Sequence, residues 1–210
     1  TAITNAEAEA ETIKIKADAE ADANNTLNKS LTDEIVADIY KTLYQHLFFI
    51  LNNLEKIVPY SNNHYSSNIA GLLYLSLLFK NNHGKTVFAF AKRELFNDIK
   101  TQVLDSGVHY EKSISYHRLM VELYGSSICL LKRRGLKIPE KISKKLQLMY
   151  DFCANYTKPN DMASLIGDND NGRFLPFIKR DFRDHHYITD PDSLENTIIY
   201  SGTDKSFFPT

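Results

Sequence analysis

Cysteine and long apolar runs are both scarce in this 210-residue sequence. Its two cysteines, Cys129 and Cys153, lack the C-x-x-C spacing of a metal site and are too few for a disulfide framework, so we expect them to be core atoms. The richest apolar run, residues 69–79, is 11 residues long. A membrane-spanning helix needs roughly 18 or more apolar residues. The sequence therefore predicts no membrane span and no metal site based on cysteine.

The sequence also lacks an excess of either charge. It holds 25 Lys and Arg against 26 Asp and Glu, for a formal net charge of -1. This balance excludes a globally basic nucleic-acid binder. With 43% hydrophobic and 24% charged residues, the chain is neither membrane-embedded nor wholly disordered, and its length predicts one domain.

The N-terminal sequence does not indicate a cellular compartment. The first thirty residues show no basic and apolar regions of a secretory signal, so the compartment is left open. The chain begins at Thr1 instead of Met, which suggests a processed chain or a fragment. Residues 1–30 form a low-complexity Ala- and Glu-rich segment, for which we expect a frayed helix or a solvated tail.

Helical periodicity dominates the middle of the chain. Apolar residues recur every three or four positions from Ile35 to Leu54, after possible caps at Ser30 or Thr32. Further helices are predicted from about residue 62 to 79, 88 to 103, 113 to 134 and 140 to 156, with a turn at 81–84. No strand signal competes, so residues 31–158 are predicted to be an all-α domain of helical hairpins.

The remaining segment, residues 159–210, holds four of the six prolines and is predicted to be loop-rich. It carries the string GDNDNGR at 167–173. The fragment D-x-D-x-G suggests a calcium loop, but the twelfth residue from Asp168 is Lys179, where an EF-hand needs Glu. We therefore exclude an EF-hand. A turn that presents Asp168, Asp170 and Arg173 to a ligand's hydroxyl groups and an exposed hydrophilic loop both remain open.

Two more polar clusters lie where helices are predicted to begin. Residues 60–65, YSNNHY, either cap a helix or use its N–H groups, an amide and the His64 imidazole to bind a carboxylate. Residues 105–118 bring together Glu111, Tyr116 and His117, which are either a polar first turn or an acid/base centre. A basic run from Lys132 to Lys145 is either a solvated helix end or a patch for a polyanion.

Taken in order, three strings resemble the heparinase II/III-like polysaccharide lyases. They are NNHYSSNIAGLLYLSLLF at 62–79, VLDSGVHYEKSISYHRLMVELY at 103–124 and TKPNDMASLIGDNDNGRFLPF at 157–177. The resemblance covers residues 35–188 and leaves out the residues before about 35. It implies that the helical hairpins form part of an (α/α) toroid, which in family members precedes a large β-sandwich region.

The resemblance also implies a reaction, β-elimination on a polysaccharide that contains uronic acid. Asn63 and His64 would neutralise the substrate carboxylate and Tyr116 would be the acid/base. His64 and Tyr116 are 52 positions apart, room for one helix out and one back. Substrate-binding residues would be His117, Glu111, Asp168, Asp170 and Arg173. No cofactor and no metal is implied for this segment; the expected partner is an acidic polysaccharide.

Two alternatives stay open beside the lyase. One is a module that binds glycans without cutting them, and the other is a helical scaffold in which the same residues only cap helices. The chain ends near where the β region of the family should start, and that region contributes further catalytic groups. We therefore expect a truncated family member of doubtful activity, or a piece that needs a β-sandwich domain or an oligomer partner. Members of the family are often periplasmic or secreted.

Overall fold

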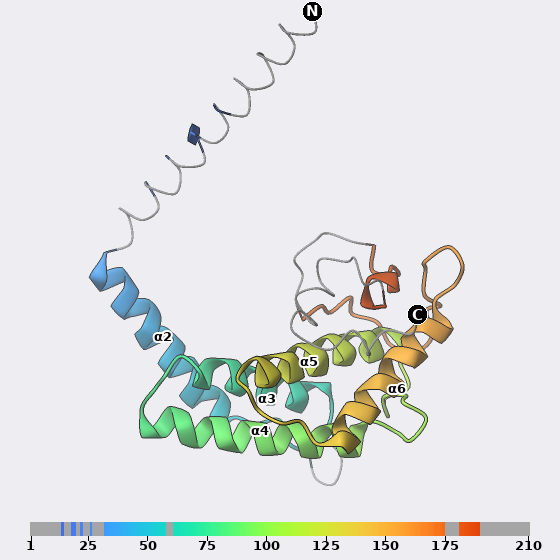
Figure 1. The fold of residues 1–210 in the computed structure, drawn as a ribbon, viewed down its shortest axis with the longest axis horizontal. Helices are drawn as coiled ribbons and strands as arrows, with labels where there is room; N and C mark the ends of the chain where they lie inside the picture. The colour runs from blue at the N-terminus through green and yellow to red at the C-terminus, as the bar shows by residue number, and fades with distance from the viewer. Residues whose placement is uncertain are drawn as a thin grey trace, which may run out of the picture. The chain divides into compact units, whose positions relative to one another are not determined.

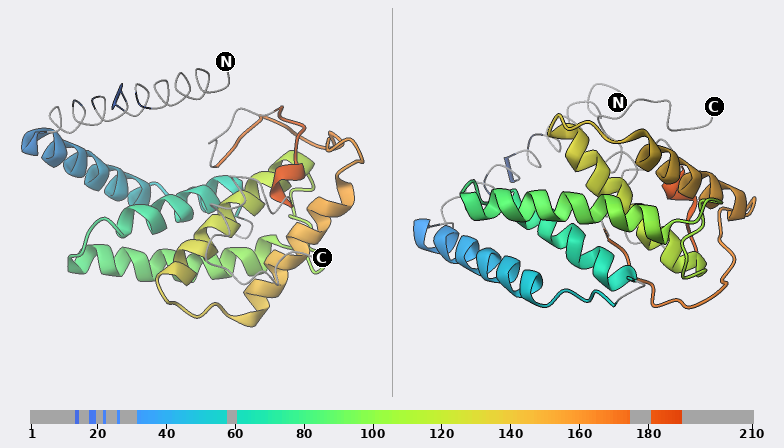
Figure 2. Two further views of the ribbon diagram at one scale, coloured as in Figure 1. Left: turned by 45° about the horizontal axis from the view of Figure 1, so that its top comes forward. Right: turned by 90° about the horizontal axis from the view of Figure 1, so that it is seen from below.

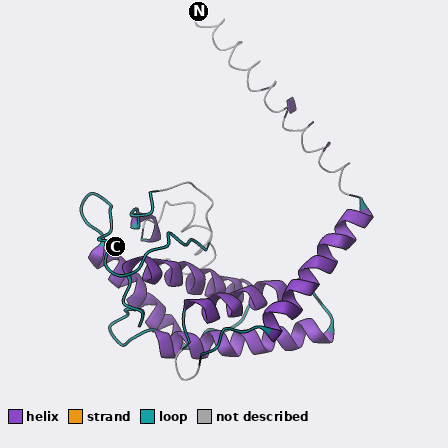
Figure 3. Cartoon of the chain, turned by 180° about the vertical axis from the view of Figure 1, so that it is seen from behind, coloured by secondary structure: helices purple, strands orange, loops and turns teal. Residues whose placement is uncertain are grey.

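The computed structural model of the chain describes residues 32–57, 61–174 and 181–189, with isolated helical positions at 14, 18, 19, 22 and 26. The elements in order are α2 (Asp33–Asn52), α3 (Asn63–Ser76), α4 (Asn82–Gln102), α5 (Ile114–Arg133), α6 (Glu140–Tyr156) and the short 3-10 helix η1 (His186–Ile188) (Figure 1). These residues include no strand, only isolated bridges such as Val103 to His109 (Figure 3). The all-α prediction is confirmed.

The assignment of the helices to part of an (α/α) toroid and the division into three segments stay predictions. The N-terminal segment 1–30 lies almost wholly outside the described residues. By its contacts the chain divides into two compact units, Thr1–His46 and Leu47–Thr210. In the first unit, the apolar stripe expected to be buried is partly exposed, since Ile35 is 44% and Ile39 47% exposed. In the second unit, Leu47 is fully buried.

Side-chain caps set the starts of three helices. Asn62, Asn81 and Ser113 each accept a hydrogen bond from the backbone N–H three residues further on, which satisfies a donor that the first helical turn leaves free. The turn predicted at 81–84 was wrong in part, because Asn81 caps a helix that already includes Gly84. A side chain at Gly84 would collide with the carbonyl group of Phe79, so the chain can only reverse this tightly at glycine.

The second unit is built around α3. This helix packs against α4 and α5, and α6 packs against the same two helices, with η1 against α5 and α6 (Figure 2). Residues buried on several sides of α3, including Ile69, Leu72 and Leu73, confirm it as an inner helix. Cys129 and Cys153 are buried and form no disulfide, as expected of core thiols. None of the described helices is long and apolar enough to cross a bilayer.

Candidate functional site

The first turn of α3 and the loop before α5 are joined by one carboxylate. The backbone N–H and the side-chain amide of Asn63 donate to the two oxygens of Glu111, at 2.8 and 2.9 Å. Lys112, the next residue, has a φ of 58°, in the left-handed region that residues other than glycine rarely adopt. Ser113 then caps α5. Two helix beginnings that are far apart in the sequence thus lie side by side.

A buried polar network lies beneath this junction. Asp98 on α4 accepts hydrogen bonds from Ser61 at 3.0 Å and Tyr124 at 2.9 Å, and also from Ser66. Gln102, one turn further along α4, donates to the backbone oxygen of Asn62 at 3.3 Å. Burial raises the pKa of Asp98, and the hydrogen bonds that it accepts oppose the rise. The network fixes the segment that carries Asn63.

Asp98 and Gln102 were not predicted from the sequence as part of the site. Their signal is present, because Asp98 and Gln102 are four positions apart and therefore share one face of α4 with the buried Leu95 and Ile99. A carboxylate and an amide on a buried face indicate a hydrogen-bonded network. Gln102 also accepts from Nε2 of His109 at 2.8 Å, which ties the same network to the loop before α5.

Tyr116 stands in the first turn of α5, half-buried. Burial, followed by the negative charges of Asp170, Asp168 and Glu111, raises the pKa of its phenol. These charges come from both sides of the tyrosine, since Glu111 precedes α5 and the two aspartates belong to the loop 166–174. The raised pKa favours the protonated phenol, which can hydrogen-bond to a substrate oxygen but is a weaker acid than a free tyrosine.

The loop 166–174 is fastened along the first two turns of α5. The backbone N–H of Ile114 donates to the carbonyl of Ile166 at 3.0 Å, and the Ser113 hydroxyl donates to the carbonyl of Asp168. Further along, Arg118 donates to the carbonyl of Gly172 at 2.6 Å. These bonds hold the side chains of the loop next to the tyrosine, where Asp168 is exposed.

Glu122 is the anchor for the end of this loop. Its carboxylate is 1% exposed and pairs with the guanidinium groups of Arg118 at 3.5 Å and Arg173 at 2.8 Å. It also accepts hydrogen bonds from the backbone N–H of Phe174, at 2.7 Å, and from the hydroxyl of Tyr187. The guanidinium of Arg173 lies 4.4 Å from the centre of the Tyr187 ring. One buried carboxylate therefore joins α5, the loop and η1.

A comparison with models of known protein families assigns the chain to one of them. Residues 12–185 match the family model described as Heparinase II/III N-terminus. The chain belongs to this family. The match begins at residue 12, so the expectation that residues before about 35 lie outside the resemblance was wrong. Neither the curated proteins nor the solved structures gave a significant match.

The heparinase II/III N-terminal domain brings several of the predicted site residues into one neighbourhood. Asn63 is hydrogen-bonded to Glu111, and the charges of Glu111, Asp168 and Asp170 act on Tyr116. Their roles in binding or catalysis stay predictions. The structural finding is that amide, phenol and three carboxylates gather where α3 and α5 begin.

His64, predicted to bind the substrate carboxylate together with Asn63, contacts a different acidic residue, Glu55. Its Nδ1 lies 2.9 Å from a carboxylate oxygen of Glu55, and both side chains are more than half exposed. Successive residues of a helix point about 100° apart. This geometry explains why adjacent side chains at the start of α3 reach Glu111 in one case and Glu55 in the other.

His117 lies in the interior of the heparinase II/III N-terminal domain. It is 1% exposed; its Nδ1 accepts the backbone N–H of His109 at 3.2 Å, and its Nε2 donates to the carbonyl of Met149 at 3.0 Å. Burial lowers the pKa of His117 to about 4, so the ring is neutral. Arg173 is also committed within the protein, as described above. Neither side chain is presented to solvent as freely as Asp168.

The described part of the heparinase II/III N-terminal domain has no group of three His, Cys, Asp or Glu side chains placed to hold a metal ion. Asp170 accepts the N–H of Gly172 at 3.1 Å, and Asn169 accepts that of Asn171 at 2.9 Å. These hydrogen bonds turn the loop on itself with its own side chains. The predicted site residues near the beginnings of α3 and α5 carry amide, phenol, imidazole and carboxylate groups.

Proposed function

We propose that this domain acts as a polysaccharide lyase, breaking a uronic-acid-containing polysaccharide by β-elimination. In that reaction the C–H bond beside the carboxylate breaks, a carbon–carbon double bond forms, and the glycosidic C–O bond breaks. The proton ends on the leaving oxygen. The family assignment and the junction of Asn63 with the Tyr116 neighbourhood support the proposal.

The environment of Tyr116 is the observation that carries the proposal. Tyr116, in the first turn of α5 and near the junction of Asn63 with Glu111, would take the proton from carbon and return it to the leaving oxygen. The exposed carboxylates of Asp168 and Asp170 suit sugar hydroxyl groups, which donate hydrogen bonds. They do not suit a substrate carboxylate, which they would repel.

The substrate carboxylate is assigned to Asn63 and His64. Glu111 at present occupies both donors of Asn63, so the substrate must either displace it or bind the second hydrogen of the amide. His64 offers an exposed imidazole to the substrate. Because Glu111 holds the amide that would neutralise a substrate carboxylate, a second candidate is a module that binds an acidic glycan without cutting it.

The test is an elimination assay with Tyr116→Phe. The wild-type protein is incubated with a panel of uronate polymers, and the near-ultraviolet absorbance of the unsaturated uronate is followed. We expect the variant to lose roughly 10²- to 10⁴-fold in rate, the usual contribution of a general acid or base. Its helical content should be unchanged, because the Tyr116 hydroxyl forms no hydrogen bond with the described residues.

Tyr40→Phe is the matched control, since it removes the hydroxyl of an exposed tyrosine on α2 and should leave the rate unchanged. Full activity of Tyr116→Phe would overturn the proposed role. Saturable binding of a uronate polymer, with no new absorbance for the wild type, would favour the binding module instead.

A further inference from the structure

A cavity of about 430 Å³ lies at the other end of α3, away from the candidate site. Its lining comes from the C-terminal end of α3, the first turns of α4 and the end of α5. The lining residues are Ser76, Leu77, Phe79, Lys80, Gly84, Lys85, Phe88 and Arg134. α3 is 14 residues long, so the two sites are separated by roughly 20 Å along the helix axis.

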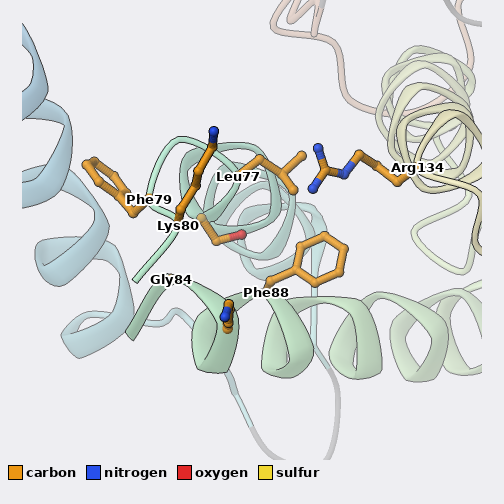
Figure 4. Close-up of a pocket in the computed structure, with 8 residues that line it drawn as sticks. Leu77, Phe79, Lys80, Gly84, Phe88 and Arg134 are labelled. Atoms are coloured by element: carbon orange, nitrogen blue, oxygen red, sulfur yellow. The ribbon is translucent and has the colours of Figure 1, made fainter. Parts of the chain in front are cut away.

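The lining combines apolar side chains with three positively charged ones and includes no acidic side chain. Figure 4 shows Phe88 rising from α4 and the guanidinium group of Arg134 reaching toward Leu77 from the end of α5. Lys80, Lys85 and Arg134 are exposed, and none of them forms an ion pair with an acid in the part of the chain that the structure describes. All three are therefore able to meet a ligand's charge.

The two chain segments that line the cavity contain no acidic residue that could pair with its cations. Residues 56–93, which include the α3 and α4 parts of the lining, contain five Lys and Arg and no Asp or Glu; of the five, Lys56 and Arg93 pair with Glu94. Residues 123–139, which include Arg134, contain four Lys and Arg and no Asp or Glu. In a chain of net charge -1, this is a local concentration of positive charge.

The lining offers little to a sugar. Its one neutral polar side chain is Ser76, whose hydroxyl already donates to the carbonyl of Leu73 at 2.8 Å. Sugar hydroxyl groups lose their hydrogen bonds with water on binding and need partners in return. The leucine and phenylalanine side chains instead favour an apolar ligand body, and the planar guanidinium of Arg134 suits a carboxylate.

From the cavity, its apolar lining and its three cations, we infer that this is a second ligand site, which binds a carboxylate with an apolar body. The volume falls within the usual range for small-ligand pockets, roughly 300–1,000 Å³. The basic run that begins at Lys132 contributes to this site through Arg134. The site is separate from the proposed elimination reaction and does not depend on it.

The test is isothermal titration of the whole chain with octanoate, a carboxylate on an alkyl chain. We expect saturable binding at one site, and an affinity about tenfold weaker in the double variant Lys85→Ala, Arg134→Ala, since exposed charge pairs contribute modestly. Both residues are exposed, so the variant should unfold at the wild-type temperature. Octanol, which has the same chain without charge, should bind more weakly than octanoate.

The double variant Lys100→Ala, Lys144→Ala is the matched control, because it removes two exposed cations outside the cavity. It should bind octanoate as the wild type does. The inference is overturned if the wild type does not bind octanoate, or if the two double variants bind it equally. It is also overturned if glucuronate binds as tightly as octanoate with the same dependence on Lys85 and Arg134, because the site would then recognise sugars.

Discussion

Replacing Glu122 with glutamine should separate the loop 166–174 from α5 and destabilise the second unit. The carboxylate is 1% exposed, and its partners Arg118 and Arg173 have side chains only 2% and 13% exposed. Removing one partner of a buried ion pair leaves uncompensated charge and costs about 3–5 kcal/mol. Small domains have total stabilities of about 5–15 kcal/mol, so this is a large fraction.

The loss in free energy of unfolding is measurable by urea unfolding, and the fall in Tm by thermal unfolding, both followed by circular dichroism. For a unit of this size, about 4 kcal/mol corresponds to a fall in Tm of roughly 8–16 °C. Limited proteolysis reports whether the loop detaches before the helices unfold. Glu140→Gln, which neutralises an exposed acid at the start of α6, is the control and should cost less than about 0.5 kcal/mol.

A double-mutant cycle with Arg173→Met tests whether the pair acts as one unit. Once Glu122 is neutral, Arg173 has lost this ion pair, so its replacement should cost at least about 1 kcal/mol less than in the wild type. The reasoning is refuted if Glu122→Gln costs under about 1 kcal/mol, or if the two substitutions are additive. Either result would mean that the buried carboxylate does not hold the loop.

Two further predictions concern the same unit. Gly167 and Gly135 both have positive φ, but a Cβ at Gly167 would lie 2.8 Å from the backbone of the α5 cap residue, whereas one at Gly135 meets nothing within 4 Å. Gly167→Ala should therefore lower the free energy of unfolding more than Gly135→Ala, for which we expect about 1 kcal/mol; equal costs in urea unfolding would contradict the packing argument. Burial lowers the pKa of His109 and His185 to about 3 and that of His117 to about 4. As the pH falls, the unfolded chain binds protons at these histidines before the folded chain does. The free energy of unfolding should therefore be highest above about pH 6.5 and fall toward pH 4, by about 1.4 kcal/mol per pH unit for each histidine. Urea unfolding at pH 7 and pH 5 measures this fall, and His117→Gln should reduce its slope by about a third.

The helices could be predicted from the sequence because their determinants are local. The last helix was predicted at 140–156 and is observed over the same residues, between Pro139 and Thr157. The cap at Ser113 and the helix start near Asn62 are set by residues within one turn of the helix they begin. The break at 81–84 was misplaced because α3 already ends at Ser76 and Asn81 caps α4, so the connection lies at residues 77–81.

The candidate site could be predicted only as a set of residue types at helix beginnings. Periodicity places Asn63, His64 and Tyr116 near helix N-termini, but it does not state which neighbour each side chain meets. In the structure Asn63 binds Glu111 and His64 meets Glu55. The rotation of a helix about its axis depends on the packing of its buried face, which involves elements far away in the sequence.

The sequence by itself determined that the chain is helical, where most of its helices begin, and which family it resembles, because capping, periodicity and motif order are properties of neighbouring residues. The tertiary structure alone decided that Arg173 is bound to Glu122, that His117 lies in the core, and that Arg134 shares a cavity with Lys80 and Lys85. These contacts join residues tens of positions apart. Their free energies depend on burial, which only the folded chain defines.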